Sequence, residues 1–309
     1  MTSYYSALFF TAFLPITVML YGMAPRRFRW AVLLLASYGF FFALSGALIA
    51  FVALSTAVVY ACARMMGANL AEKNRQLAQA SSGKREIREA CKRKNRRIVF
   101  AAVVANIGIL AVLKYSGFFG LSLASALAAF GISIDLSIPS FALPIGISFY
   151  TLMAVSYVVD VYRERTKADK NLGHVALFLA FFPGIMEGPL SRYNDVAPSL
   201  IAGEPLNRKN LYAGTLRIMW GMAKKIIVAD RLNAFVKPVF DNYGSYDGGV
   251  IALAAILYTI QLYCDFSGTM DVALGMGRVF NVTLPENFRQ PFFSRTASEF
   301  WQRWHITLG

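Results

Sequence analysis

Long apolar runs alternate with short clusters of basic residues along this chain, and this pattern limits the possible folds more than any other feature. Residues 4–22, 28–45, 47–66 and 98–113 are almost wholly apolar. A helix of about twenty apolar residues matches the hydrocarbon thickness of a membrane. Hydrophobic residues make up 57% of the chain and charged residues 16%, whereas about a quarter of a soluble domain is charged. The sequence therefore predicts an all-α, polytopic integral membrane protein with about six to eight spanning or re-entrant helices around a polar cavity or tunnel.

The basic clusters predict the orientation of these helices. Arg26, Arg27 and Arg29 follow the first apolar run, eleven Lys or Arg stand against three Glu between residues 64 and 97, and residues 163–167 form a third basic cluster. Residues 115–162 between the last two clusters contain no Lys or Arg. Short cytoplasmic loops accumulate Lys and Arg, so the clusters are placed inside and the N-terminus outside. No basic residue precedes the first run, which we interpret as a retained span and not as a secretory signal.

The basic segment 67–97 has two interpretations. It is either a solvated helical hairpin that anchors the topology, or a docking surface for anionic lipid headgroups or an acidic acyl-carrier partner. No repeat and no linker rich in Gly, Ser or Pro divides the chain, so residues 1–309 are predicted to form one membrane domain that contains this segment. The net charge of +14 is confined to short blocks without an aromatic surface for base stacking, which argues against a nucleic-acid partner.

The second half of the chain is less regular. Residues 118–130 and 174–186 are apolar but too short to span. The first run is predicted to lie in the interface or to re-enter the membrane, and the second to form a re-entrant helix. Residues 211–235 are amphipathic and either cross at a tilt or lie at the inner interface. Residues 250–280 would form a helix of about 46 Å, and we expect a break near residues 265–268. Gly268 and Gly275 are seven residues apart and would allow another helix to approach closely.

Ionisable residues inside apolar segments usually face a cavity or one another. Asp265 and Asp271 are such residues, and Ser267 shares a helix face with Asp271. The two aspartates either orient a catalytic base, bind acceptor hydroxyls, or form structural ion pairs with Arg278 or Arg289.

His305 is the main catalytic candidate. An imidazole can act as a general base near neutral pH, although the residues alone favour an interfacial histidine between two tryptophans. Arg303 and Trp304 either line a donor site or anchor the helix end. Asn287 follows Pro285 and Glu286 in the position of a helix cap, and His174 is interpreted as incidental.

Other chemistries lack support in the sequence. Three cysteines lie far apart without a C-x-x-C pair, and the chain has only two histidines, so no metal site is predicted. Ser148 lacks the final glycine of a nucleophile elbow, and Gly275 and Gly277 lack the third glycine of a dinucleotide loop. We therefore predict no bound cofactor.

Three motifs follow one another closely near the end of the chain. They are Asp265-Phe266-Ser267-Gly268 with Asp271, Pro285-Glu286-Asn287-Phe288, and Phe300-Trp301-x-Arg303-Trp304-His305. Together they resemble the membrane-bound O-acyltransferase family, in its bacterial alginate O-acetylase branch. Segments 143–150, 160–163, 181–183 and 188–193 agree with this resemblance, which covers about residues 140–309.

The resemblance implies an enzyme that moves an acyl group, most often acetyl, from a cytoplasmic thioester to hydroxyls of an exported or cell-surface polysaccharide. The donor would be acyl-CoA or an acyl carrier, His305 would be catalytic, and substrate would contact Asp265, Ser267, Asp271, Asn287, Arg303 and Trp304. It implies a bacterial inner-membrane location, contact with membrane lipid, and a periplasmic or surface acyl-handling partner. The family uses a second histidine further downstream, so we expect this chain to be truncated at its C-terminus and to lack a complete, active site. The alternatives are a transporter or export channel with buried carboxylates, and an inactive scaffold.

Overall fold

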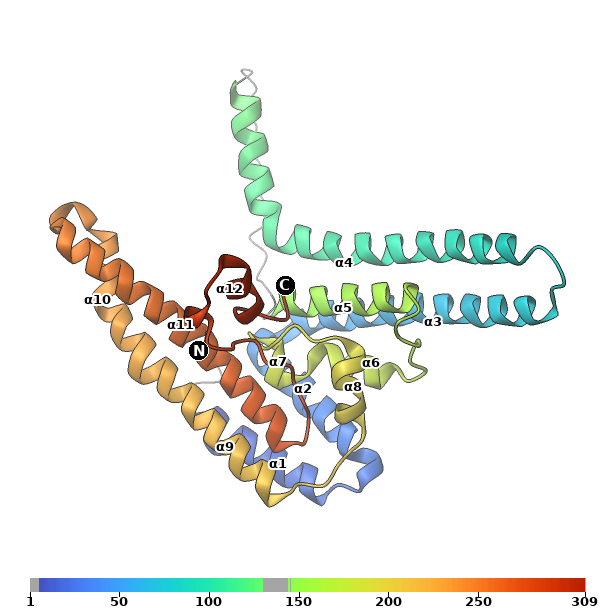
Figure 1. The fold of residues 1–309 in the computed structure, drawn as a ribbon, viewed down its shortest axis with the longest axis horizontal. Coiled ribbons are helices and arrows are strands. Elements are labelled where there is room, and N and C mark those ends of the chain that lie inside the picture. Colours follow the sequence, from blue (N-terminus) through green and yellow to red (C-terminus); the bar gives the residue numbers. More distant parts are fainter. Residues whose placement is uncertain (1–5, 130–143, 145, 309) are drawn as a thin grey trace. The chain divides into compact units, whose positions relative to one another are not determined.

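The computed structural model describes residues 6–129, 144 and 146–308 as an assembly of helices (Figure 1). Within these residues no strand forms, and the one isolated bridge joins Phe288 to Trp304. Three helical stretches are long and apolar enough to cross a membrane, at Arg26–Gln79, Lys84–Gly120 and Gly248–Val279. Phe9–Met23 and Ile147–Tyr162 are shorter apolar helices. The predicted all-α, multi-pass membrane architecture is confirmed.

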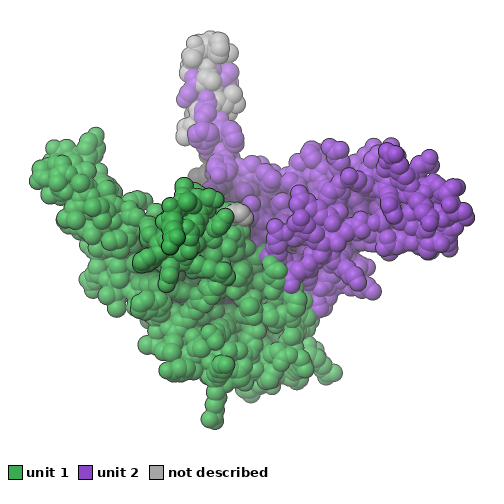
Figure 2. Space-filling view, viewed as in Figure 1, with its two compact units in different colours: residues 1–33, 186–191, 195–309 green, residues 34–185, 192–194 purple. Residues whose placement is uncertain are grey.

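The contacts divide the chain into two compact units (Figure 2). Unit 1 comprises Met1–Leu33, Met186–Ser191 and Asp195–Gly309, and unit 2 comprises Leu34–Ile185 and Arg192–Asn194. Each unit is described by itself below.

Unit 2 is built on a long antiparallel hairpin (Figure 1). Helix α3 (Ile49–Gln79) and helix α4 (Lys84–Ala129) pack along each other, and Gly83 turns the chain between them with a positive φ of 74°. Helix α5 (Ile147–Tyr162) packs on both. The basic segment 67–97 therefore forms the two helical arms of a hairpin. Residues 118–129, which we expected to form a separate short segment, continue α4, and Phe130 lies outside the described residues.

The core of unit 2 holds two short helices, α6 (Leu172–Ala180) and α7 (Phe182–Ile185), which split the apolar run predicted to be too short to span. Every side chain of α6 from Val175 to Ala180 is buried. The N–H of Phe182 donates to the Ser37 hydroxyl at 3.1 Å, which ties α7 to helix α2 (Arg29–Ser45). Gly146 begins α5 in the left-handed region, where a Cβ would lie 1.9 Å from the Ile185 carbonyl oxygen. Only glycine fits this position.

Unit 1 is built around helix α11 (Gly248–Val279). A continuous helical run packs along it, formed by α9 (Arg208–Met222), the π-helical η4 (Ala223–Ala229) and α10 (Asp230–Asp241) (Figure 1). This run contains the stretch predicted to be amphipathic. Tyr21 of the N-terminal α1 packs its ring against Phe280 at 5.3 Å. The remaining elements of both units are η1 (Phe9–Phe13), α1 (Leu14–Met23), η2 (Arg26–Phe28), η3 (Gly46–Leu48), α8 (Tyr193–Ile201), η5 (Tyr243–Ser245), η6 (Pro291–Phe293) and α12 (Ala297–Arg303).

Two glycine pairs set the contact between α9 and α11. A Cβ on Gly221 would lie 2.5 Å from the Gly268 carbonyl oxygen, and a Cβ on Gly214 would lie 2.7 Å from that of Gly275. The predicted close approach at Gly268 and Gly275 is confirmed. The predicted break near residues 265–268 is wrong, because α11 is unbroken there. Cationic side chains from the neighbouring run meet the carboxylates of α11, so the helix does not have to open to solvate them.

Candidate active site

His305 is held by a short antiparallel pairing between two of the three sequence motifs. The N–H of Arg289 donates to the Arg303 carbonyl at 3.0 Å, and the N–H of Ile306 donates to the Asn287 carbonyl at 3.1 Å. The bridge between Phe288 and Trp304 lies between these bonds. The Pro-Glu-Asn-Phe segment therefore fixes the backbone on both sides of His305.

Asn287 strengthens this pairing with its side chain, which is 1% exposed. Its Oδ1 accepts a hydrogen bond from the Thr307 N–H at 2.9 Å, and its amide nitrogen lies 3.3 Å from the Met270 sulfur on α11. The Thr307 hydroxyl in turn accepts from the Leu190 N–H at 3.1 Å. The turn that follows His305 is thus tied to α11 and to segment 188–191.

Trp304 packs inside an aromatic cluster drawn from all three motifs. Its ring stacks on Phe300 at 5.6 Å and stands perpendicular to Phe288 at 5.0 Å. Tyr263 of α11 lies 6.1 Å away. Phe266 of the Asp-Phe-Ser-Gly motif reaches the imidazole of His305, with ring centroids 4.9 Å apart. The cluster brings the first and third motifs together at the histidine.

The imidazole of His305 is half-buried. The residue has a positive φ of 47°, an uncommon conformation outside glycine. Its Nδ1 is buried and has no hydrogen-bond partner within the described part of the chain. Burial lowers the pKa of His305 below 6.5, because desolvation disfavours the imidazolium. A neutral imidazole is suited to accept a proton from a hydroxyl group.

A hollow of about 720 Å³ opens beside this segment. Arg303 lines it and pairs with Glu299 at 2.5 Å, one helical turn earlier in α12. The other lining residues are Tyr263, Phe288, Arg289, Gln290, Glu299 and Gln302. Residues of the second and third motifs thus line a space that could admit a substrate.

Asp271 is the centre of an ion-pair network. It accepts from the Arg217 guanidinium at 2.9 and 3.0 Å and from the Lys224 ammonium at 2.6 Å. Arg217 also binds Glu286 in a bidentate manner, at 2.5 and 2.6 Å, which holds the Pro-Glu-Asn-Phe segment against α9. The Ser267 hydroxyl, 2% exposed as a residue, accepts from Lys224 at 3.3 Å.

Asp265 pairs with Lys225, which also lies 3.7 Å from Asp230. Lys224 and Lys225 both belong to the π-helical turn of η4. Successive residues of a regular α-helix point about 100° apart, and the wider π turn brings two consecutive lysines towards α11. π turns occur frequently at functional sites.

The predicted partners of these aspartates were therefore wrong. Arg278 instead contacts Asn210 at 3.5 Å, and the cations that meet Asp265 and Asp271 come from α9 and η4. No contact joins either aspartate to His305 among the described residues. Arg217 and Lys224 were not predicted as partners of these aspartates. Each follows a glycine of the close helix contact by three positions, so the sequence does place it on the helix face that meets α11.

His174, interpreted from the sequence as incidental, is part of a polar network in unit 2. Its Nδ1 lies 3.2 Å from the Asp169 carboxylate, which also accepts from the Tyr193 hydroxyl at 2.5 Å. Nearby, the buried Asp160 pairs with Arg192 at 3.3 Å and so joins two of the upstream motif segments. No cluster of three metal-binding side chains is found in the described ranges.

The comparisons with known proteins relate the chain to acyltransferases. No protein-family model matches the chain. The probable alginate O-acetylase AlgI of Azotobacter vinelandii is 34% identical over 308 residues, which cover 98% of this chain and 56% of that protein. The chain is a relative of the bacterial membrane-bound O-acyltransferases. The predicted resemblance is confirmed, and it extends beyond residues 140–309 to nearly the whole chain.

Two further relatives come from other branches of the group. The peptidoglycan O-acetyltransferase of Helicobacter pylori is 31% identical over 233 residues, covering 67% of this chain and 43% of that protein. The teichoic acid D-alanyltransferase of Bacillus subtilis is 28% identical over 172 residues, covering 53% and 42%. The chain spans about half the length of the curated relatives it matches.

Proposed function

We propose that the product of this gene transfers an acyl group, most often acetyl, from a cytoplasmic thioester to hydroxyl groups of an exported or cell-surface polysaccharide. The observation that carries the proposal is the half-buried imidazole of His305 at the meeting point of three motifs. The similarity to acyltransferases over 98% of the chain supports it. The donor is acyl-CoA or an acyl carrier, and the protein lies in the bacterial cytoplasmic membrane with its N-terminus outside, where a periplasmic or surface acyl-handling protein assists it.

His305 acts as the general base in this reaction. It takes the proton of the acceptor hydroxyl as the oxygen attacks the thioester carbonyl carbon. The carbon–sulfur bond breaks, and the imidazolium returns the proton to the leaving thiolate. Arg303 lines the neighbouring hollow and contacts substrate there, whereas Asn287 and Trp304 hold the histidine in place.

The alternative of an ion-coupled transporter has weaker support. Asp265 and Asp271 each meet lysine or arginine at ion-pair distance, and Ser267 contacts Lys224. These paired carboxylates support a structural role in which the network positions the Pro-Glu-Asn-Phe segment.

A substitution of His305 tests the proposal. The gene is deleted from its host and replaced by the wild type, by His305→Ala, or by His174→Gln as the control that changes the other histidine. Ester-linked acetate is then released from isolated surface polysaccharide by mild alkali and measured. General-base catalysis contributes about 10²- to 10⁴-fold, so His305→Ala should lose nearly all acylation at unchanged membrane abundance. Unchanged ester content in the deletion strain would refute the function, and full activity of His305→Ala would refute the role of this residue.

A further inference from the structure

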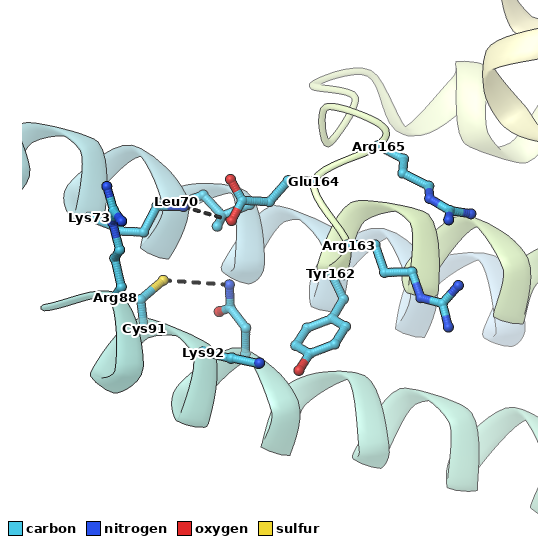
Figure 3. A pocket seen from close by; sticks show the side chains of 10 residues that line it. Leu70, Lys73, Arg88, Cys91, Lys92, Tyr162, Arg163, Glu164 and Arg165 are labelled. Carbon is cyan, nitrogen blue, oxygen red and sulfur yellow. Dashed lines mark hydrogen bonds and ion pairs between the residues drawn. The ribbon is translucent and has the colours of Figure 1, made fainter. Parts of the chain in front are cut away.

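Two hollows lie next to each other in unit 2, where the basic arms of α3 and α4 meet the end of α5. The first has a volume of about 750 Å³ and is strongly cationic. Tyr162 points from the end of α5 towards α4 (Figure 3). The one carboxylate of this hollow, Glu164, pairs with Lys73 at 2.7 Å. Its remaining charged lining residues are Arg88, Lys92, Arg163 and Arg165.

The second hollow, of about 690 Å³, shares Tyr162 and Arg163 with the first. One part of its wall is cationic and the other part is apolar. Among the described residues, its four arginines have no ion pair with a carboxylate. The cationic part consists of Arg93, Arg96, Arg97 and Arg163, and the apolar part of Val99, Phe100, Val103 and Val159.

Both helices that form the second hollow change from charged to apolar at this level. On α4 the basic cluster ends at Arg97 and the apolar run 98–113 begins at Ile98. On α5 the apolar run, which contains the buried Asp160, ends at Tyr162, and a basic cluster begins at Arg163. Phe100 is 69% exposed, although it follows the last arginine by only three positions. The hollow therefore straddles the level at which basic residues give way to apolar residues.

We propose that this second hollow binds an anionic phospholipid of the inner leaflet. The headgroup phosphate lies among the arginines, whose planar guanidinium groups suit bidentate contact with phosphate oxygens. An acyl chain lies along Phe100 and the three valines. A soluble anion would use only the cationic part, so the apolar part favours a lipid over a soluble acidic partner. This inference does not depend on the proposed acyl transfer.

Photo-crosslinking in native-like membranes tests the proposal. The chain is reconstituted in bilayers of phosphatidylcholine that contain a trace of phosphatidylglycerol with a photoactivatable acyl chain, and labelled peptides are mapped by mass spectrometry. We expect labels on the segments that carry residues 99–103 and 159. Photoactivatable phosphatidylcholine at the same level should label them at least fivefold less. Equal labelling by both lipids would overturn the proposal without any variant.

Matched variants then separate a site from general electrostatic attraction. The double variant Arg96→Gln with Arg97→Gln should lower labelling at least fivefold. The double variant Lys84→Gln with Arg85→Gln removes the same charge from the first turn of the same helix and should leave labelling unchanged. An equal loss in both variants, or no loss in either, would overturn the proposal. Soluble glycerol phosphate in tenfold excess over the labelled lipid should not compete, and full competition would show that the apolar wall has no role.

Discussion

At the scale of single residues, the site depends on how His305 is supported and not on a charged partner. Its neighbours are the ring of Phe266 and the backbone pairing with residues 287–289. The nearby carboxylates are occupied by Arg217, Lys224 and Lys225. The histidine is therefore kept neutral by burial and fixed by hydrogen bonds that its neighbours make.

The first prediction concerns the pH dependence of acyl transfer. Burial lowers the pKa of His305, so the neutral base persists to a lower pH than an exposed histidine would allow. The rate should stay constant as pH falls from 8 to 7 and should drop only below about 6.5, the ordinary histidine value. The measurement is kcat/KM for acyl transfer in isolated membranes between pH 5 and 8. An acidic limb centred above pH 7 would contradict the assignment of His305 as the base.

The second prediction concerns Asn287. Its replacement by alanine removes the acceptor of the Thr307 N–H in a buried position, which costs about 1 to 3 kcal/mol. The variant should unfold at a lower temperature in detergent and should transfer acyl groups more slowly, because the turn after His305 is released. Asn242→Ala, at an exposed position, is the control and should match the wild type. Wild-type stability of Asn287→Ala would show that the buried hydrogen bond contributes little.

At the scale of elements, α9 and α11 are fixed by backbone contact at the two glycine pairs. Bulk at either pair separates the helices and stretches the ion pairs between Arg217 and Asp271 and between Lys224 and Asp271. Helix packing through small residues is common in membranes, where tight van der Waals contact replaces the hydrophobic effect.

The third prediction follows from this contact. In Gly221→Ala the added methyl group would lie 2.5 Å from a carbonyl oxygen, so the variant should lose several degrees of thermal stability in detergent. Gly108→Ala is a matched control inside α4, because its Cβ would meet nothing within 4 Å. Alanine forms helix better than glycine, so the control should be neutral or slightly stabilised. Equal melting temperatures for both variants would contradict the packing argument.

The same elements explain what the sequence could and could not predict. The spacing of Gly268 and Gly275 predicted a close helix approach, because side chains seven apart share a helix face. The break expected near residue 265 rested on the length of the apolar run, which exceeds the hydrocarbon thickness. It failed because the compensating cations belong to another helix, which a single segment does not reveal. The pairing of Phe288 with Trp304 has no periodic signature, so only the family resemblance brought these motifs together.

At the scale of the whole molecule, the basic clusters give the only guide to orientation. The fourth prediction is tested in a background where Cys62, Cys91 and Cys264 are replaced by alanine. Single cysteines are then introduced at Ser82, Lys167 and Ala47, all of which are exposed. In intact cells a membrane-impermeant maleimide should label Ala47→Cys alone, and in inverted inner-membrane vesicles it should label Ser82→Cys and Lys167→Cys. The reverse pattern would invert the proposed orientation.

The paired glycines of α9 and α11 also limit how the molecule can move. A slide of one turn, about 5.4 Å, would carry each glycine away from its counterpart and drive side-chain bulk into the opposite backbone. These two helices therefore cannot slide along each other by a turn. The two helices move together as one rigid unit. Any opening that admits substrate or releases product therefore has to occur in other segments of the chain.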